Sequence, residues 1–202
     1  MTDGEYWAAL KKEAAKGDVD AAWKLADAYA DGYVERGRGA LFYVRQNRAL
    51  AERWYRFVAK TRERDAILGL ASVQKNLRDA LRLELKAWRM GIVAAANNIA
   101  MTYSMMGRAD LCFKWLRRGY AIDPEGCAYH LALCFFVGYG TARNLKKALQ
   151  FFDMVLNNHW ECPDSMECAA LFVKMVANGE TARPPRRGRS IGSIRPTGAP
   201  DW

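Results

Sequence analysis

The sequence predicts an all-α protein, a right-handed solenoid of about four helical hairpins with capping helices. Two observations carry this prediction. A stripe of small, aliphatic and aromatic residues recurs along the chain at helical spacing, and an amphipathic second segment follows it each time. Glycine and aspartate also stand where such helices would end and begin. Recurring units of this kind are typical of stacked helical hairpins.

Each copy of the stripe has a small residue, then an aliphatic residue and alanine four and five positions later, then an aromatic residue. This spacing places all four side chains on one helix face. The second copy has Gln74 in place of the aromatic residue, and a degraded fifth copy has Leu171 and Phe172. The other members are Ala21-Leu25-Ala26-Tyr29, Ala66-Leu70-Ala71, Ala95-Ile99-Ala100-Tyr103 and Cys127-Leu131-Ala132-Phe135.

The second helices are expected over residues 47–60, 77–90, 109–120 and 144–156, because apolar residues recur there on one helical face. Residues 5–16 are expected to form a lone opening helix that caps the stack.

Helix boundaries are indicated by capping residues. Asp20 and Asp65 stand where first helices should start, and Asp123 precedes a proline at the first helical position. Several glycines stand where helices should stop. No β-hairpin signal competes with these helices. The glycines are Gly32, Gly91, Gly107, Gly138 and Gly140.

Two segments resemble Sel1-like repeats, a tetratricopeptide-like family. Residues 14–29 read AAKGDVDAAWKLADAY, and residues 128–149 contain a Gly-x-Gly turn followed by Asn144 and a Lys-Lys-Ala-Leu helix start. The resemblance spans about residues 5–178 and is most specific in the first and fourth hairpins. It implies an adaptor or interaction module, and the family fixes no partner.

Composition and charge indicate the cellular compartment and the kind of partner to expect. The formal net charge is +9, which favours partners with acidic faces and also allows nucleic acid. The N-terminus shows no secretory signal, and no apolar run is long enough to span a membrane. Five cysteines, an odd number, indicate a reduced, cytoplasmic protein, with a bridge between Cys162 and Cys168 left open.

Two regions are expected from composition. Residues 1–179 would form the helical repeat domain, and residues 180–202 a flexible basic tail rich in proline, arginine and glycine, because the tail has almost no aliphatic side chains to bury. The tail is either dispensable or a non-specific binder of acidic surfaces. The oligomeric state is not fixed by the sequence.

The first candidate binding surface is the long connection over residues 33–46. Helix–helix connections in stacked hairpins usually have about 2–8 residues, and insertions in repeats often form the binding face. The alternative is an extension of the following helix. The candidate partner-binding residues here are Arg36, Arg38, Phe42 and Tyr43.

The second candidate is the inner groove, which the first helices of this architecture line. Aromatic and asparagine side chains there suit a bound peptide or helix, although Trp23 and Tyr129 would alternatively pack between hairpins. The candidate residues, taken as exposed, are Asp20, Trp23, Lys24, Asp27, Asn97, Asn98, Met101, Tyr129, His130 and Leu133.

A basic stripe on the second helices is the third candidate. Arg78, Arg82 and Lys86 follow one another at intervals of four residues and so share one face. Such a stripe is usually solvated, but it would also suit an acidic partner or nucleic acid.

The sequence shows no phosphate loop, dinucleotide fingerprint or nucleophile elbow, so no enzyme activity and no cofactor are expected. Only His130 and His159 are available, and neither stands in a convincing metal-ligand set. The leading hypothesis is therefore a protein-binding adaptor, within which a bacterial immunity-type inhibitor that masks a toxin is favoured. The alternatives are a nucleic-acid-binding regulator and, less favoured, a subunit of a membrane-surface assembly.

Overall fold

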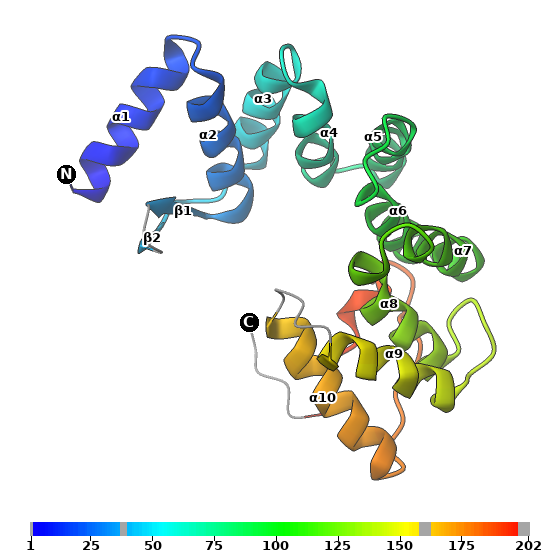
Figure 1. The fold of residues 1–202 in the computed structure, drawn as a ribbon. Helices are drawn as coiled ribbons and strands as arrows, with labels where there is room; N and C mark the ends of the chain where they lie inside the picture. The colour runs from blue at the N-terminus through cyan, green and yellow to red at the C-terminus, as the bar shows by residue number, and fades with distance from the viewer. Residues whose placement is uncertain (1, 37–39, 158–162, 198–202) are drawn as a thin grey trace. The chain divides into compact units, whose positions relative to one another are not determined.

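The computed structural model describes residues 2–36, 40–157 and 163–197. The chain divides into two compact units, Met1–Ile92 and Val93–Trp202, where the sequence suggested one repeat domain over residues 1–179. The described residues form ten α-helices, one two-stranded antiparallel sheet and one 3₁₀ turn (Figure 1).

The first unit holds five helices and both strands. Each helix packs on the next along the chain, from α1 to α5, and α2 and α3 form the first repeat hairpin. The second hairpin is made by α4 and α5. The elements are α1 (Asp3–Ala15), α2 (Val19–Asp31), β1 (Tyr33–Arg36), β2 (Ala40–Tyr43), α3 (Arg48–Ala59), α4 (Glu63–Ser72) and α5 (Leu77–Arg89).

The second unit holds the other five helices. Hairpins α6–α7 and α8–α9 follow the same plan, and α10 packs on α9. The expected four hairpins with additional helices at both ends are therefore confirmed. The elements are α6 (Ala95–Met105), α7 (Ala109–Tyr120), α8 (Pro124–Val137), α9 (Leu145–Asn157), α10 (Pro163–Ala177) and the 3₁₀ turn η1 (Ile191–Ser193).

The caps explain most helix boundaries. Asp123 caps α8 as expected, since its carboxylate accepts the Gly126 N–H. The other two expected caps are wrong: α2 is capped by Asp18, and α4 starts after Arg62. All five glycines expected at helix ends have positive φ, a conformation that costs glycine nothing.

The connection 33–46 is neither an irregular loop nor a helix extension. It forms a β-hairpin in which Tyr33 pairs with Tyr43 and Val34 with Phe42, so the expectation that no β-hairpin exists is wrong here. Val34 and Phe42 lie on the same face of the strands. Val34 is buried and Phe42 is half-buried against the Tyr6 and Trp7 rings, while Tyr43 is 86% exposed.

Helix α8 is the centre of the second unit. Seven consecutive residues, from Leu131 to Val137, are buried, because α7, α9 and η1 all pack against this helix. Phe136 also contacts Phe152 of α9 and Phe172 of α10, whose two rings stack at 5.3 Å. A helix that is apolar on every side needs neighbours on every side.

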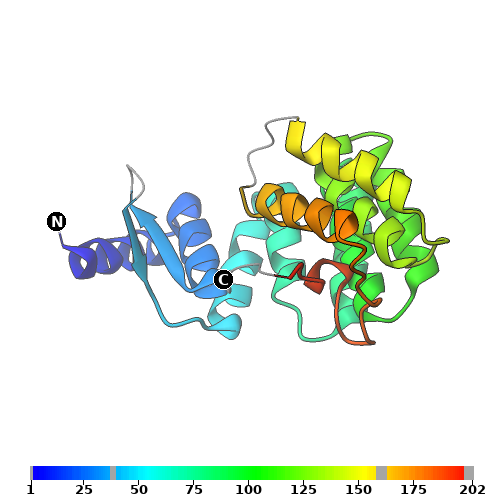
Figure 2. The same cartoon turned by 90° about the horizontal axis from the view of Figure 1, so that it is seen from below.

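The C-terminal segment provides one of these neighbours. Ile191 is fully buried and Ile194 nearly so, and both belong to the hydrophobic cluster that contains α8. The segment, red in Figures 1 and 2, lies beside α8 and below α10 in the second view. Over residues 188–197 the expected flexible tail is therefore corrected to a packed strap, and residues 198–202 lie outside the described part of the chain.

Candidate protein-interaction surfaces

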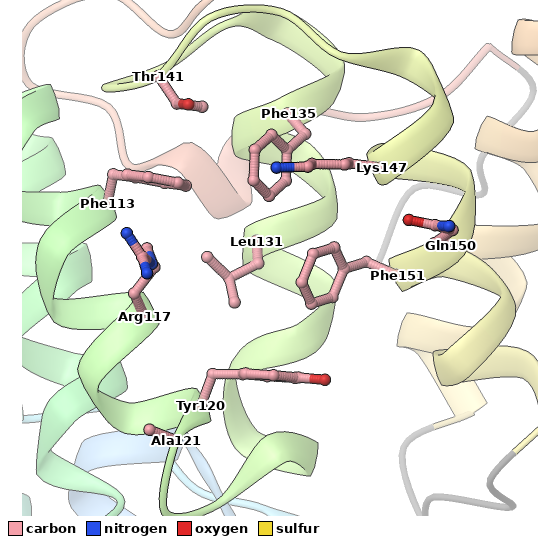
Figure 3. A pocket seen from close by; sticks show the side chains of 10 residues that line it. All are labelled: Phe113, Arg117, Tyr120, Ala121, Leu131, Phe135, Thr141, Lys147, Gln150 and Phe151. Carbon is pink, nitrogen blue, oxygen red and sulfur yellow. The ribbon is translucent and has the colours of Figure 1, made fainter.

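The second unit has an open cleft between α7 and α9, with α8 as its floor. Its volume is about 710 Å³, within the usual range for ligand pockets. Leu131 and Phe135 of α8 form the floor, and side chains from α7 and α9 face one another across it (Figure 3). The walls are Phe113, Arg117, Tyr120 and Ala121 on one side and Lys147, Gln150 and Phe151 on the other, with Thr141 at one end.

Aromatic contacts fix the shape of the cleft. The Phe135 ring stacks on Phe151 at 5.7 Å and meets Phe113 edge-on at 5.4 Å. The Tyr120 ring meets the other end of this chain of rings, 5.2 Å from Phe151. Aromatic pairs of this geometry stabilise one another by about 0.5–1.5 kcal/mol beyond their buried area, so the cleft is preformed.

Two cations border this apolar surface. The Lys147 ammonium lies 5.3 Å from the Phe135 ring centroid, in cation–π contact. Arg117 is exposed, and no carboxylate in the described ranges forms an ion pair with it. The cleft therefore combines an apolar floor with a positive wall.

Shallower hollows extend the cleft over both walls. The hollow on α7 is lined by Asp110, Phe113, Lys114, Arg117 and Arg118. Its one carboxylate is exposed and forms an ion pair with Arg108, whose guanidinium lowers the pKa of the Asp110 carboxyl. Positive charge therefore dominates on this side.

The candidate residues of α2 mostly hold the first unit together. The Asp27 carboxylate accepts a 2.6 Å hydrogen bond from the Tyr55 hydroxyl of α3, and burial, followed by this bond, raises the pKa of Tyr55. Asp20 forms an ion pair with Arg62 at 2.5 Å, and Trp23 packs half-buried against the core. Lys24 is exposed. Asp20 is also exposed despite its ion pair, so these two of the four have the open position that the prediction assumed.

The candidates in the β-hairpin separate into two faces. Phe42 packs inward and Tyr43 points to solvent, where it joins the exposed Tyr33 and Leu41. The Arg36 side chain and all of Arg38 lie outside the described part of the chain.

Two of the candidate groove residues of the second unit lie against the C-terminal strap. His130 and Met101 are partly buried and face Gly192 of the strap. Leu133 is fully buried, so the expectation that it is exposed is wrong. The remaining three, Asn97, Asn98 and Tyr129, are half-buried, and the Tyr129 ring packs against Phe152.

Solved structures share this arrangement of helices. A Sel1 repeat protein from Oxalobacter formigenes aligns with 89% of this chain and 71% of its own, at 17% identity and a TM-score of 0.60. A protective antigen with an SLR fold from uropathogenic Escherichia coli aligns with 88% of this chain and 37% of its own, at 17% identity and a TM-score of 0.55. No family model and no curated protein matches the chain.

The chain has the Sel1-like repeat fold. The fold accounts for the order of its helices and for the small residues at their contacts. Because the identity is low, the likeness concerns the fold alone. The chain spans about a third of the length of the Escherichia coli protein.

Sequence reasoning did not find the cleft of this Sel1-like chain. Phe135 was assigned to the repeat stripe and Phe151 to the packing face of its helix, and both contribute to packing as well as to the cleft. The sequence signal was the pair Phe113 and Arg117. They lie four residues apart on a second helix, outside the apolar stripe predicted for that helix. Helical spacing shows which residues share a face, and it does not show that the neighbouring helices leave this face open.

The cysteines of the Sel1-like helices fill the core. Burial raises the pKa of the Cys127 thiol to about 12, and a hydrogen bond with Cys112, followed by burial, raises that of Cys134. Cys168 is also buried, and Cys162 lies outside the described residues. Thiols with raised pKa values form little thiolate, which is consistent with their interpretation as small apolar side chains.

No group of three or more His, Cys, Asp or Glu side chains in the described residues is placed to hold a metal ion. None of the described helices is both long and apolar enough to cross a membrane.

Proposed function

We propose that this protein is an interaction scaffold, and that its cleft between α7 and α9 binds a segment of a partner protein. The segment carries an apolar or aromatic side chain next to a carboxylate. The observation that supports this most directly is the preformed aromatic cleft with Arg117 in its wall. A net charge of +9 favours the same acidic partner.

The chemistry of the cleft fits such a segment. An inserted apolar side chain would cover Leu131 and contact Phe113 and Phe151, which removes apolar area from water. A neighbouring carboxylate would pair with Arg117, whose planar guanidinium donates two parallel hydrogen bonds. Rigid aromatic walls lower the ordering cost of binding.

A peptide-display selection tests the proposal without a known partner. The intact protein is the target, and we expect enriched peptides with an aromatic or aliphatic residue beside Asp or Glu. Arg117→Glu should weaken binding of the enriched peptides about 10- to 100-fold, because an ionic hydrogen bond contributes about 1.5–3 kcal/mol. Phe151→Ala should weaken it similarly, since the wall is removed. Fluorescence anisotropy measures both.

The matched control is Arg78→Glu, which makes the same charge change on an exposed position of α5. We expect less than a twofold effect from it. If Arg117→Glu and Arg78→Glu weaken binding equally, the peptides are held by the net positive charge of the whole molecule and not by the cleft. The proposal then fails.

Within this scaffold role we propose an immunity-type inhibitor that acts in the cytoplasm and masks an acidic toxin. The basic charge and the preformed surface support this narrower proposal. The test is co-expression with the product of the neighbouring gene. Growth that is restored by the intact protein and lost with Arg117→Glu supports it, and unchanged growth in both contradicts it.

A further inference from the structure

The C-terminal strap binds the second unit in the way a short linear peptide would. Ile191 and Ile194, three residues apart, are both buried, and so is Pro196. Ser193 lies between the two isoleucines and is exposed, and its hydroxyl donates to the Ser190 carbonyl within the strap at 2.7 Å. The strap contacts α6 and α8 through η1. This places it over His130 and Met101, two of the predicted groove residues.

The backbone of the strap is held by α6. The Ile191 N–H donates to Ser104 Oγ at 2.8 Å, although the two residues are 87 positions apart. Ser104 Oγ donates to the Tyr139 hydroxyl at 3.2 Å, and this hydroxyl donates back to the Ser104 carbonyl. A second N–H, that of Gly188, donates to the Met105 carbonyl at 2.9 Å. A bound peptide backbone would find the same acceptors.

Gly192 makes the closest approach. A Cβ atom at this position would stand 2.9 Å from His130 Nε2 and 3.7 Å from Met101 Sδ. Since real Cβ atoms are essentially never found as close as 2.9 Å, a larger residue here requires either the His130 ring or the strap to move, and a branched side chain adds to this displacement. The groove therefore selects for glycine directly after the first isoleucine.

The two ends of the strap are tied down weakly. At its far end the Arg195 guanidinium and the Thr197 N–H donate to the sulfur atoms of Cys168 and Met175, which are weak acceptors, and the exposed Thr197 hydroxyl donates to Glu180 Oε2 at 3.2 Å. At its near end residues 183, 184, 186 and 187 are exposed. The strap thus depends on two isoleucines and a few hydrogen bonds, which is the scale of a linear motif.

We propose that the face of the second unit formed by α6, α8 and α10 is a peptide-binding groove, and that the chain's own residues 188–197 occupy it in place of a partner. The partner presents an extended segment with two aliphatic side chains three residues apart and a glycine after the first. This groove is separate from the cleft between α7 and α9, so the inference does not rest on the proposed function.

The first test cuts the strap free in the full chain. A protease recognition sequence is inserted between the exposed Arg183 and Pro184, and the purified protein is cleaved there. A fluorescein-labelled peptide of residues 184–202 should then exchange into the cleaved protein and raise its anisotropy. Its apparent affinity for the uncleaved protein should be at least tenfold weaker, because the tethered strap competes. A peptide carrying Ile191→Asp should not bind.

The second test leaves the chain uncut. Gly192→Val should expel the strap, so that amide hydrogen exchange over residues 188–197 rises at least tenfold while α7 and α9 keep their protection. The labelled wild-type peptide should bind this intact variant. The matched control is Ser193→Ala at the exposed neighbouring position, which should change neither measurement.

Three outcomes would overturn the inference. The cleaved protein could lose its helical circular dichroism when the strap leaves, or the strap could fail to exchange over days; each makes the strap an integral part of the core. Equal peptide binding to cleaved and uncleaved protein would place the binding elsewhere. Arg117→Glu changes the cleft between α7 and α9 and should leave strap exchange unchanged. A failure of the groove proposal can therefore be distinguished from a failure of the proposed function.

Discussion

Burial beneath the strap changes the ionisation of single residues in the second unit. His130 is the clearest case, because burial lowers its pKa from 6.5 to about 4. Its neighbours include the Tyr129 ring on its own helix and Gly192 of the strap, neither of which carries a charge at neutral pH. The ring is therefore neutral in the folded protein and becomes charged more readily in the unfolded one.

This difference predicts a pH dependence of stability. Between pH 6.5 and about 4 the unfolded state binds a proton at His130 that the folded state does not, so stability is lost as pH falls through this window. The loss from this residue is at most about 1.4 kcal/mol per pH unit. Urea unfolding of the wild type and of His130→Gln measures it, since carboxylate titrations cancel in the difference. A difference that is constant from pH 7 to 4.5 would contradict the assignment.

The residue scale also shows where sequence reasoning stops. The helical phase placed Leu131 and Ala132 correctly in the core. The same phase placed Leu133 on an exposed face, but this side chain is fully buried in a cluster that includes Ile191 and Ile194, more than fifty residues later in the chain. Local spacing identifies the faces of a helix, and long-range contacts decide which of them meet solvent.

At the scale of elements, the turn between α8 and α9 fits tightly against the start of α7. Gly140 has φ +69°, and a Cβ atom there would stand only 2.0 Å from the Ala109 carbonyl oxygen. Gly179, after α10, has nearly the same φ of +72° but open space around it. Comparing the same substitution at the two positions therefore separates the cost of the left-handed backbone from the cost of steric contact.

We therefore expect different costs for the same substitution. Gly179→Ala should destabilise the protein by about 1 kcal/mol, the usual cost of a left-handed conformation for an L-residue. Gly140→Ala should cost about 1–3 kcal/mol more, because the turn must also move away from α7. Thermal or urea unfolding followed by circular dichroism measures both. Equal losses would show that the contact with Ala109 is relaxed without cost.

The elements themselves were predictable where the helical pattern was long. The second helices at 48–59, 77–89, 109–120 and 145–157 begin and end within a residue or two of expectation. The β-hairpin was missed because four-residue strands are too short to show alternation, although the Gly-Arg-Gly between them is a three-residue connection typical of hairpins. The cleft was missed because it depends on a gap between helices.

At the scale of the whole molecule, the net charge of +9 makes binding sensitive to salt. A peptide held by one carboxylate pair in the cleft should lose affinity shallowly as salt rises, with a slope of about −1 in a plot of log affinity against log salt. A nucleic acid bound through three or more phosphates along α5 should show a slope of about −3 or steeper.

The measurement is a titration of the enriched peptide and of a 20-base-pair duplex at several salt concentrations. We expect the shallow slope with the peptide and weak binding of the duplex. Tight duplex binding with the steep slope would favour the nucleic-acid alternative, for which the exposed arginines of α5 would be the contact surface.

The burial of α8 on every side has a consequence for synthesis on the ribosome. The first unit contains all its own packing partners within residues 1–92 and can fold while the rest of the chain is still being made. The second unit cannot cover α8 until Ile191 and Ile194 have left the exit tunnel, about sixty residues after α8 itself. During that interval part of the apolar surface of α8 stays uncovered, and we expect chaperones to bind the nascent chain mainly over its second half.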